Sequence, residues 1–303
     1  MTFDMRTSPC RLILLFTIVV FQSYALYAQN TMIETISDFG KGIIFADGVT
    51  TLNGPGYTYD KLDDLNTEIH YDTFLSFTDD PKEGINSEML LQIGRIYTKF
   101  FSPLLHACDS ALHSGGRQIG FRSKVLSKAN PVFINDCYYT DFSSGELSFV
   151  CRFATEDFEY TETPPDIEWK TDAETRIICG YKCLKATGRF RGRTYEAWYT
   201  EDIPASVGPW KLRGLPGAIL LAEDTERLCR FEATSISFGT GVIEKPNYPY
   251  IKISRKQYRT MLGQYIKTPG RFCSMHMSRA PGIVITPPAK ETPLRGVVLL
   301  EKQ

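Results

Sequence analysis

The stretch RTYEAWYTEDIPASVGPWKLRGLPGAILLAED, residues 193–224, determines how the centre of this chain folds. It begins with an aromatic run typical of a strand, passes through a loop of Pro and Gly residues that holds Trp210, and ends in an apolar run. Pro followed by Gly favours a type II turn, because Pro fixes φ near about −65° and Gly accepts a positive φ. We therefore expect a turn over Leu215–Ala218 with Gly217 at positive φ, followed by a buried strand over Ala218–Ala222.

Two interpretations of the loop and turn remain open. They form a rigid corner that leads into a core strand, or a binding loop, since Gly permits close approach of a ligand and loops often carry function. Trp210 is ambiguous in the same way, because Trp fills cores and also anchors interfaces. The candidate site is this signature loop and turn, and its residues are Tyr199, Pro204, Gly208, Pro209, Trp210, Gly214, Leu215, Pro216 and Gly217.

The same stretch resembles the signature block of the GLPGLI family, which consists of secreted proteins of Bacteroidota. The hexapeptide that names the family corresponds to residues 214–219, with Ala218 in place of the second Leu. The resemblance is best from Ile178 to Ile236 and weaker over residues 89–102. It implies no catalytic residues, because the family has no established activity. Family members are thought to accompany outer-membrane uptake systems, so the resemblance implies an outer-membrane receptor as a partner.

The first 28 residues predict a secretory signal peptide. Two arginines precede the apolar run Leu12–Phe21, and Ala28 supplies a small residue for cleavage. The run is shorter than the ~20 residues of a transmembrane helix, and no second run of that length follows. We expect residues 29–303 to form a single domain with a weakly matching N-terminal region and a Pro-rich tail. The expected location is the periplasm or the periphery of the outer membrane.

The net charge limits the class of binding partner, and the number of cysteines limits the possible disulfides. Loss of residues 1–28 changes the formal net charge only from −1 to −2, which gives no electrostatic basis for binding nucleic acid. Eight cysteines are present, seven of them after Ala28, so an odd number remains in the exported chain. Cys179 and Cys183 are expected in one strand over Arg176–Thr187. At ~3.3 Å per residue they would be ~13 Å apart, too far for a disulfide.

Alternating apolar residues and turn signals predict consecutive antiparallel strands. The clearest alternation is Leu147–Phe153. The other predicted strand regions are Tyr57–Phe77, Glu88–Phe101, Arg176–Thr187, Arg193–Thr200, Ala218–Ala222 and Arg227–Phe238.

One helix is predicted strongly after residue 253. Ser254 and Gln257 match a capping box, and apolar residues from Tyr258 to Ile266 have helical spacing. Ser102 followed by Pro103 predicts a second, short helix. The expected fold class is β-rich α+β, with a curved, half-barrel-like antiparallel sheet covered on one face by one or two helices.

The sequence contains no recognisable catalytic motif. None of the four histidines has the spacing of a helical zinc pair, and no nucleophile elbow, phosphate loop or dinucleotide fingerprint occurs. We predict no catalytic residue, no metal and no cofactor. The acidic pairs at 201–202 and 223–224 are expected to be exposed ends of strands. Arg189, Arg191 and Arg193 are expected to pair with them, the alternative being a site for an anionic headgroup.

The expected function is that of a non-catalytic envelope protein that binds a partner protein or a lipid-like apolar ligand. The rival hypothesis is a hydrolase whose site is assembled from residues distant in the sequence. An apolar groove without converging titratable groups would favour binding, whereas a pocket where His meets Cys or acids would favour hydrolysis.

Overall fold

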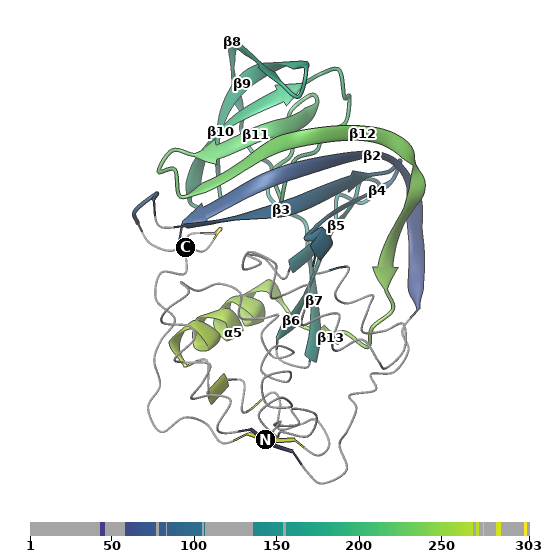
Figure 1. Ribbon diagram of the computed structural model, residues 1–303, viewed down its shortest axis with the longest axis vertical. Coiled ribbons are helices and arrows are strands. Elements are labelled where there is room, and N and C mark those ends of the chain that lie inside the picture. The colour runs from purple at the N-terminus through teal and green to yellow at the C-terminus, as the bar shows by residue number, and fades with distance from the viewer. Residues whose placement is uncertain are drawn as a thin grey trace, which may run out of the picture.

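The computed structural model describes residues 43–45, 58–76, 79–82, 84–104, 106, 136–153, 156–268, 271–272, 275, 283–285 and 300–301. A single open sheet of twelve strands dominates this part of the chain (Figure 1). Its spatial order is β13-β7-β6-β5-β4-β3-β2-β12-β11-β10-β9-β8. All neighbouring strands are antiparallel except β13 and β7.

In chain order the strands of this sheet are β2 (Tyr59–Ser76), β3 (Gly84–Ile93), β4 (Tyr97–Phe101), β5 (Asp136–Asp141), β6 (Leu147–Phe153), β7 (Glu156–Glu162), β8 (Lys170–Ile178), β9 (Tyr181–Phe190), β10 (Arg193–Thr200), β11 (Ala218–Asp224), β12 (Cys229–Pro246) and β13 (Ile251–Lys252). Two further short strands, β1 (Ile43–Phe45) and β14 (Ile283–Ile285), pair with each other. The predicted β-rich fold with a curved sheet is confirmed, and the predicted bounds of β6 and β10 match the structure.

The sheet curls because its two longest strands bend together. β2 and β12 pair from Leu75 opposite Cys229 to Tyr59 opposite Pro246, with register irregularities along the way. Such bulges increase twist and bend the strands. In Figure 1 both strands arch across the molecule below β8 to β11 and descend on the right.

The bend brings the end of β12 against one face of strands β4 to β7. There the Nζ atom of Lys99 donates a hydrogen bond to the carbonyl oxygen of Glu244 at 3.0 Å. The Nζ atom of Lys245 lies 2.7 Å from the carboxylate of Glu159, which is 4% exposed. These contacts join the end of β12 to β4 and β7 on that face of the curled sheet.

The helix α5 (Arg255–Lys267) covers the opposite face of β6 and β7. The predicted capping box is present, since Ser254 and Gln257 exchange both hydrogen bonds. The ring of Tyr258 packs on Phe149, with centroids 4.7 Å apart. This is the covering helix expected from the sequence. Of the second predicted helix, residues 103, 104 and 106 are helical, and the rest lies outside the described residues.

The predicted single strand over Arg176–Thr187 is wrong. Residues 179 and 180 form a two-residue hairpin loop between β8 and β9, with φ of 50° at Cys179 and 84° at Gly180. Positive φ at both positions is typical of a type I′ turn. Cys179 and Cys183 are both free, as expected, although not because one extended strand separates them.

The predicted signal peptide, most of the N-terminal region and most of the Pro-rich tail lie outside the described residues. No helix within the described ranges is long and apolar enough to cross a membrane.

Candidate functional site

The signature loop, residues 201–217, connects β10 to β11 and folds back onto them. The amide of Ala218 donates to the carbonyl of Ile203 at 3.1 Å, and the amide of Ile219 donates to the carbonyl of Val207 at 2.9 Å. Both acceptors belong to buried residues of the loop. The loop is therefore fixed to the sheet by backbone hydrogen bonds.

The turn in this loop differs from the predicted geometry. Gly217 does not have a positive φ, whereas Gly214, three residues earlier, has a φ of 98°. A Cβ atom on Gly217 would lie 2.0 Å from the carbonyl oxygen of Thr200. Gly217 is thus required because two backbone segments touch, and the predicted positive φ at this position was wrong.

Trp210 lies inside the molecule at the inner end of the loop. Its side chain is 4% exposed, and its ring meets Phe190 edge-on with centroids 5.5 Å apart. Its φ of 58° is unusual for a residue other than Gly, so the surrounding packing holds this backbone conformation. From outside, the indole nitrogen of Trp169 donates to the carbonyl oxygen of Arg213 at 2.8 Å. Two tryptophans therefore fix the loop from opposite sides.

The other residues of the candidate site divide between the interior and the surface. Tyr199, Gly208, Pro209, Leu215 and Gly217 are buried, while Pro204, Gly214 and Pro216 are exposed. The structure thus places the signature loop mainly as packed scaffold. Its segment from Ser206 to Gly214 also forms one wall of a pocket.

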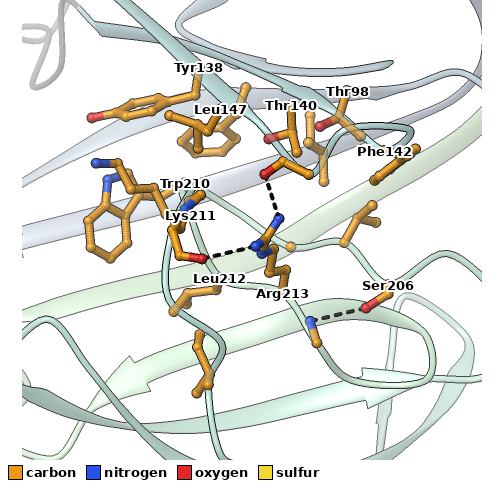
Figure 2. Close-up of a pocket in the computed structure, with 18 of the residues that line it drawn as sticks. Thr98, Tyr138, Thr140, Phe142, Leu147, Ser206, Trp210, Lys211, Leu212 and Arg213 are labelled. Atoms are coloured by element: carbon orange, nitrogen blue, oxygen red, sulfur yellow. Dashed lines mark hydrogen bonds between the residues drawn. The ribbon is translucent and has the colours of Figure 1, made fainter. Parts of the chain in front are cut away.

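This pocket has a volume of about 480 Å³ and lies between the signature loop and strands β3 to β6 (Figure 2). Its size is within the range of small-molecule sites, about 300–1,000 Å³. Nine of the nineteen lining residues have large apolar or aromatic side chains, namely Leu91, Phe100, Tyr138, Phe142, Leu147, Ile167, Val207, Trp210 and Leu212. These side chains offer an apolar surface to the uncharged part of a ligand.

Polar groups gather on two facing sides of the pocket. Figure 2 shows Thr98 and Thr140 on one wall and Arg213 on the other. The guanidinium of Arg213 donates to the carbonyl oxygens of Gly145 at 3.3 Å and Pro164 at 3.0 Å. These two bonds fix its position without neutralising its charge.

Two exposed apolar side chains lie beside the pocket. Ile96 is 47% exposed and Phe142 is 40% exposed, and the amide of Phe142 donates to the carbonyl of Ile96 at 2.8 Å. This bond joins the β3–β4 and β5–β6 turns. Phe142 also lines the pocket, so the two joined turns form an apolar edge of the pocket.

Behind the loop, Lys211 is the centre of an ionic network. Its Nζ atom is 2.6 Å from Glu162 and 2.7 Å from Glu301, and its side chain is only 1% exposed. Glu162 also pairs with Arg191 at 2.7 Å, and Glu301 pairs with Arg255 of α5. The network therefore joins the loop, β7, α5 and the described end of the chain.

The sequence did not identify Lys211, since one lysine between Trp210 and Leu212 gives no signal of burial. It also misassigned Asp224, which was expected to be an exposed strand end. The side chains of Arg193 and Asp224 are 2% and 1% exposed and pair with each other. The Asp224 carboxylate also accepts hydrogen bonds from the amides of Leu228 and Cys229 at 2.7 and 2.9 Å. The carboxylate is buried because it closes the β11–β12 turn.

The three arginines do not share one face. Arg189 is exposed on β9, Arg191 lies in the β9–β10 turn with a φ of 48°, and Arg193 is buried. Of the expected pairings with the acids at 201–202 and 223–224, the structure shows that of Arg193 with Asp224, which is buried and not on the surface. Arg191 pairs instead with Glu162 of β7.

The pocket brings together no pair of groups suited to nucleophilic catalysis. Its lining includes neither histidine nor cysteine. Ser206 accepts a hydrogen bond from the amide of Gly214 at 3.0 Å. Within the described ranges, no three His, Cys, Asp or Glu side chains are grouped to hold a metal ion. The pocket combines apolar walls with polar groups on two of its sides.

Comparison with known proteins gives a family match around the signature loop and matches of low identity to two solved structures. Curated proteins give no significant match. Structures of PNGF-II in its P21 and C2 crystal forms are similar, with TM-scores of 0.48 and 0.49 at 18% and 17% identity. In both cases the match covers 67% of this chain and 34% of the other. This chain thus spans about a third of those proteins. Residues 190–221 match a family described as a protein of unknown function (Porph_ging), so over its signature loop the chain is similar to a family whose function is open.

Proposed function

We propose that this chain is a non-catalytic binding protein whose pocket behind the signature loop takes up the apolar body of a small molecule. The observation that supports this most directly is the pocket of about 480 Å³, whose lining combines large apolar and aromatic side chains with polar groups on two sides. Pockets that bind small ligands have this composition, because the apolar walls provide affinity and the polar groups fix orientation.

The rival hypothesis of a hydrolase has less support. An activated nucleophile needs a base within hydrogen-bond reach, and the described lining of this pocket offers no such pair. Asp166 is fully exposed, and Lys211 is engaged by two carboxylates.

A neutral, apolar fluorescent probe tests the pocket directly. N-phenyl-1-naphthylamine should bind the purified chain and gain fluorescence in the apolar interior. Thr140→Phe should displace it, because Thr140 lines the pocket and a larger ring occupies the space. Thr161→Phe is the matched control, since Thr161 is exposed on β7. Equal binding by both variants, or no binding by the unmodified chain, would contradict the proposal.

Export remains part of the proposal and has its own test. The leader ending at Ala28 predicts that the mature chain begins at Gln29. N-terminal sequencing of protein from the cell envelope should find Gln29, and an intact Met1 in the cytosol would contradict export. The outer-membrane receptor stays a prediction, and a test would be its co-purification with the chain from envelope extracts.

A further inference from the structure

We propose that the pocket takes an amphiphile with one negatively charged head group, whose head is held by Arg213, Thr98 and Thr140 while its apolar tail lies inside. This inference rests on the proposed function and names the chemical class of the ligand.

Arg213 keeps a positive charge that the protein does not neutralise. The two hydrogen bonds of Arg213 go to neutral carbonyl oxygens. A guanidinium has several N–H donors, so the remaining donors of Arg213 are available to a ligand. The nearest carboxylate, Asp166, is 3.9 Å away and fully exposed, so solvent screens most of that pairing. The side chain of Arg213 is also only 24% exposed, so it is partly desolvated before a ligand arrives.

Lys211 provides the internal comparison. It belongs to the same loop and also borders the pocket, but two carboxylates within 2.7 Å satisfy its charge. An anion would gain nothing at Lys211 and would be repelled by Glu162 and Glu301. Of the two cations that line the pocket, Arg213 is therefore the one positioned to receive an anion.

The two threonines across from Arg213 supply further donors. Thr98 and Thr140 line the pocket, and their hydroxyls make no hydrogen bond within the described part of the chain. Thr98 is 6% exposed as a residue. Partly buried donors without a protein partner favour a ligand that accepts hydrogen bonds. A carboxylate or a similar single anion would accept from both threonines and from the guanidinium fork.

The charge of the head is limited by the number of available cations. Of the two cations in the lining, Lys211 is already paired with two carboxylates, so Arg213 balances one negative charge. The apolar lining behind the threonines has no other free charge, so the remainder of the ligand is apolar. The structure thus favours a singly charged head and an uncharged tail.

Competition against the neutral probe tests this assignment. Dodecanoate, dodecanol and dodecylammonium, each below the concentration at which it forms micelles, share one tail and differ in their heads. Dodecanoate should displace the probe at a concentration about tenfold lower than dodecanol does, as expected for charge-assisted hydrogen bonds to the head. Dodecylammonium should be the weakest. Added salt should reduce the difference between the displacing concentrations of dodecanoate and dodecanol, because it screens the charge of Arg213.

Substitutions assign the effect to Arg213. Arg213→Gln should remove the advantage of dodecanoate over dodecanol, and a cooperative thermal melt should show that the variant folds. Arg213→Lys should keep part of the advantage. Arg189→Gln, an exposed arginine on β9, is the matched control and should behave like the unmodified chain.

The outcomes separate the two proposals. If dodecanoate and dodecanol compete equally, or if Arg213→Gln keeps the difference, the anionic head is excluded while the apolar pocket stands. If neither the probe nor any of the three amphiphiles binds, the pocket itself is not a binding site and both proposals fail.

Discussion

Lys211 and Glu301 are 90 residues apart in sequence, and the Nζ atom of one lies 2.7 Å from the carboxylate of the other. This pair attaches the described end of the chain to the signature loop. Glu301→Gln should lower the free energy of unfolding by about 1–3 kcal/mol at neutral pH, because a charged acceptor of the buried Lys211 is lost. Urea unfolding measures the difference. Glu168→Gln, at an exposed position, is the control.

The same pair predicts a dependence of stability on pH. Burial by itself would raise the pKa of the Glu301 carboxyl, but the charges and hydrogen bonds of Lys211 and Arg255 outweigh burial and lower it. A carboxyl with a lowered pKa stabilises the fold above its unfolded pKa of about 4.3, and this stabilisation is lost as the pH falls through the folded pKa. The melting temperature should therefore fall in acid, and it should fall less steeply in Glu301→Gln. Parallel curves would contradict this role of Glu301.

Gly217 should not tolerate even the smallest side chain. A Cβ atom would lie 2.0 Å from the carbonyl oxygen of Thr200, and a backbone oxygen cannot rotate away. Gly217→Ala should therefore cost on the order of 3 kcal/mol or more. Gly214→Ala is the comparison, since it has a φ of 98° but its nearest contact would be an ordinary 3.5 Å. Thermal melts should show the larger loss for Gly217→Ala, and the reverse order would contradict the close approach.

Trp210 should contribute strongly to stability. Trp210→Ala removes a side chain that is 4% exposed and packs against Phe190 and Tyr195, and it should cost about 3–5 kcal/mol. Trp210→Phe keeps an aromatic ring in the same place and should cost less. The measurement is the midpoint of urea unfolding. An Ala variant as stable as the unmodified chain would show that this ring is not part of the core.

Ligand chain length should affect affinity in a defined way. Each methylene that enters the apolar interior should strengthen binding by about 0.8 kcal/mol, roughly fourfold in affinity. The gain should stop once the tail fills the cavity of about 480 Å³. Calorimetric titration with fatty acids from octanoate to hexadecanoate measures this. An affinity that does not change along the series would mean that the tail remains outside the pocket.

The free thiols should differ in reactivity. Cys179 is exposed in the β8–β9 turn, whereas Cys183 is fully buried and burial raises its pKa to about 11. Since the thiolate is the reactive form, iodoacetamide should label Cys179 in the folded chain and Cys183 only after unfolding. Mass spectrometry of the labelled peptides distinguishes them. Equal labelling under native conditions would contradict the burial of Cys183.

Local patterns in the sequence were enough to predict most elements of the sheet and the helix α5. The period-two alternation of Leu147–Phe153 and the capping box at Ser254 are local signals, and the structure confirms both. The hairpin at Cys179 and Gly180 was missed because the apolar run continues across it, and Cys gives no turn signal.

The site itself could be predicted only in part. The loop sequence pointed to Trp210 and the glycines, but the pocket depends on strands that precede the loop by 60 to 120 residues, which no local pattern connects. Likewise, the burial of Lys211 and Asp224 follows from partners elsewhere in the fold. Charged residues are usually exposed, so sequence reasoning places them on the surface unless their partners are known.

The ladder between β2 and β12 has a consequence for how the chain acquires its fold. Leu75 pairs with Cys229 and Tyr59 pairs with Pro246. The edge of β2 that faces β12 therefore stays unpaired until β12, which begins more than 150 residues after the end of β2, folds against it. Contacts this distant in sequence form slowly, because a large loop must close before they are made. An unpaired strand of 18 residues is also a template for another chain. While the protein folds, the unpaired edge of β2 is therefore its main site for aggregation, and this risk ends when β12 pairs with that edge.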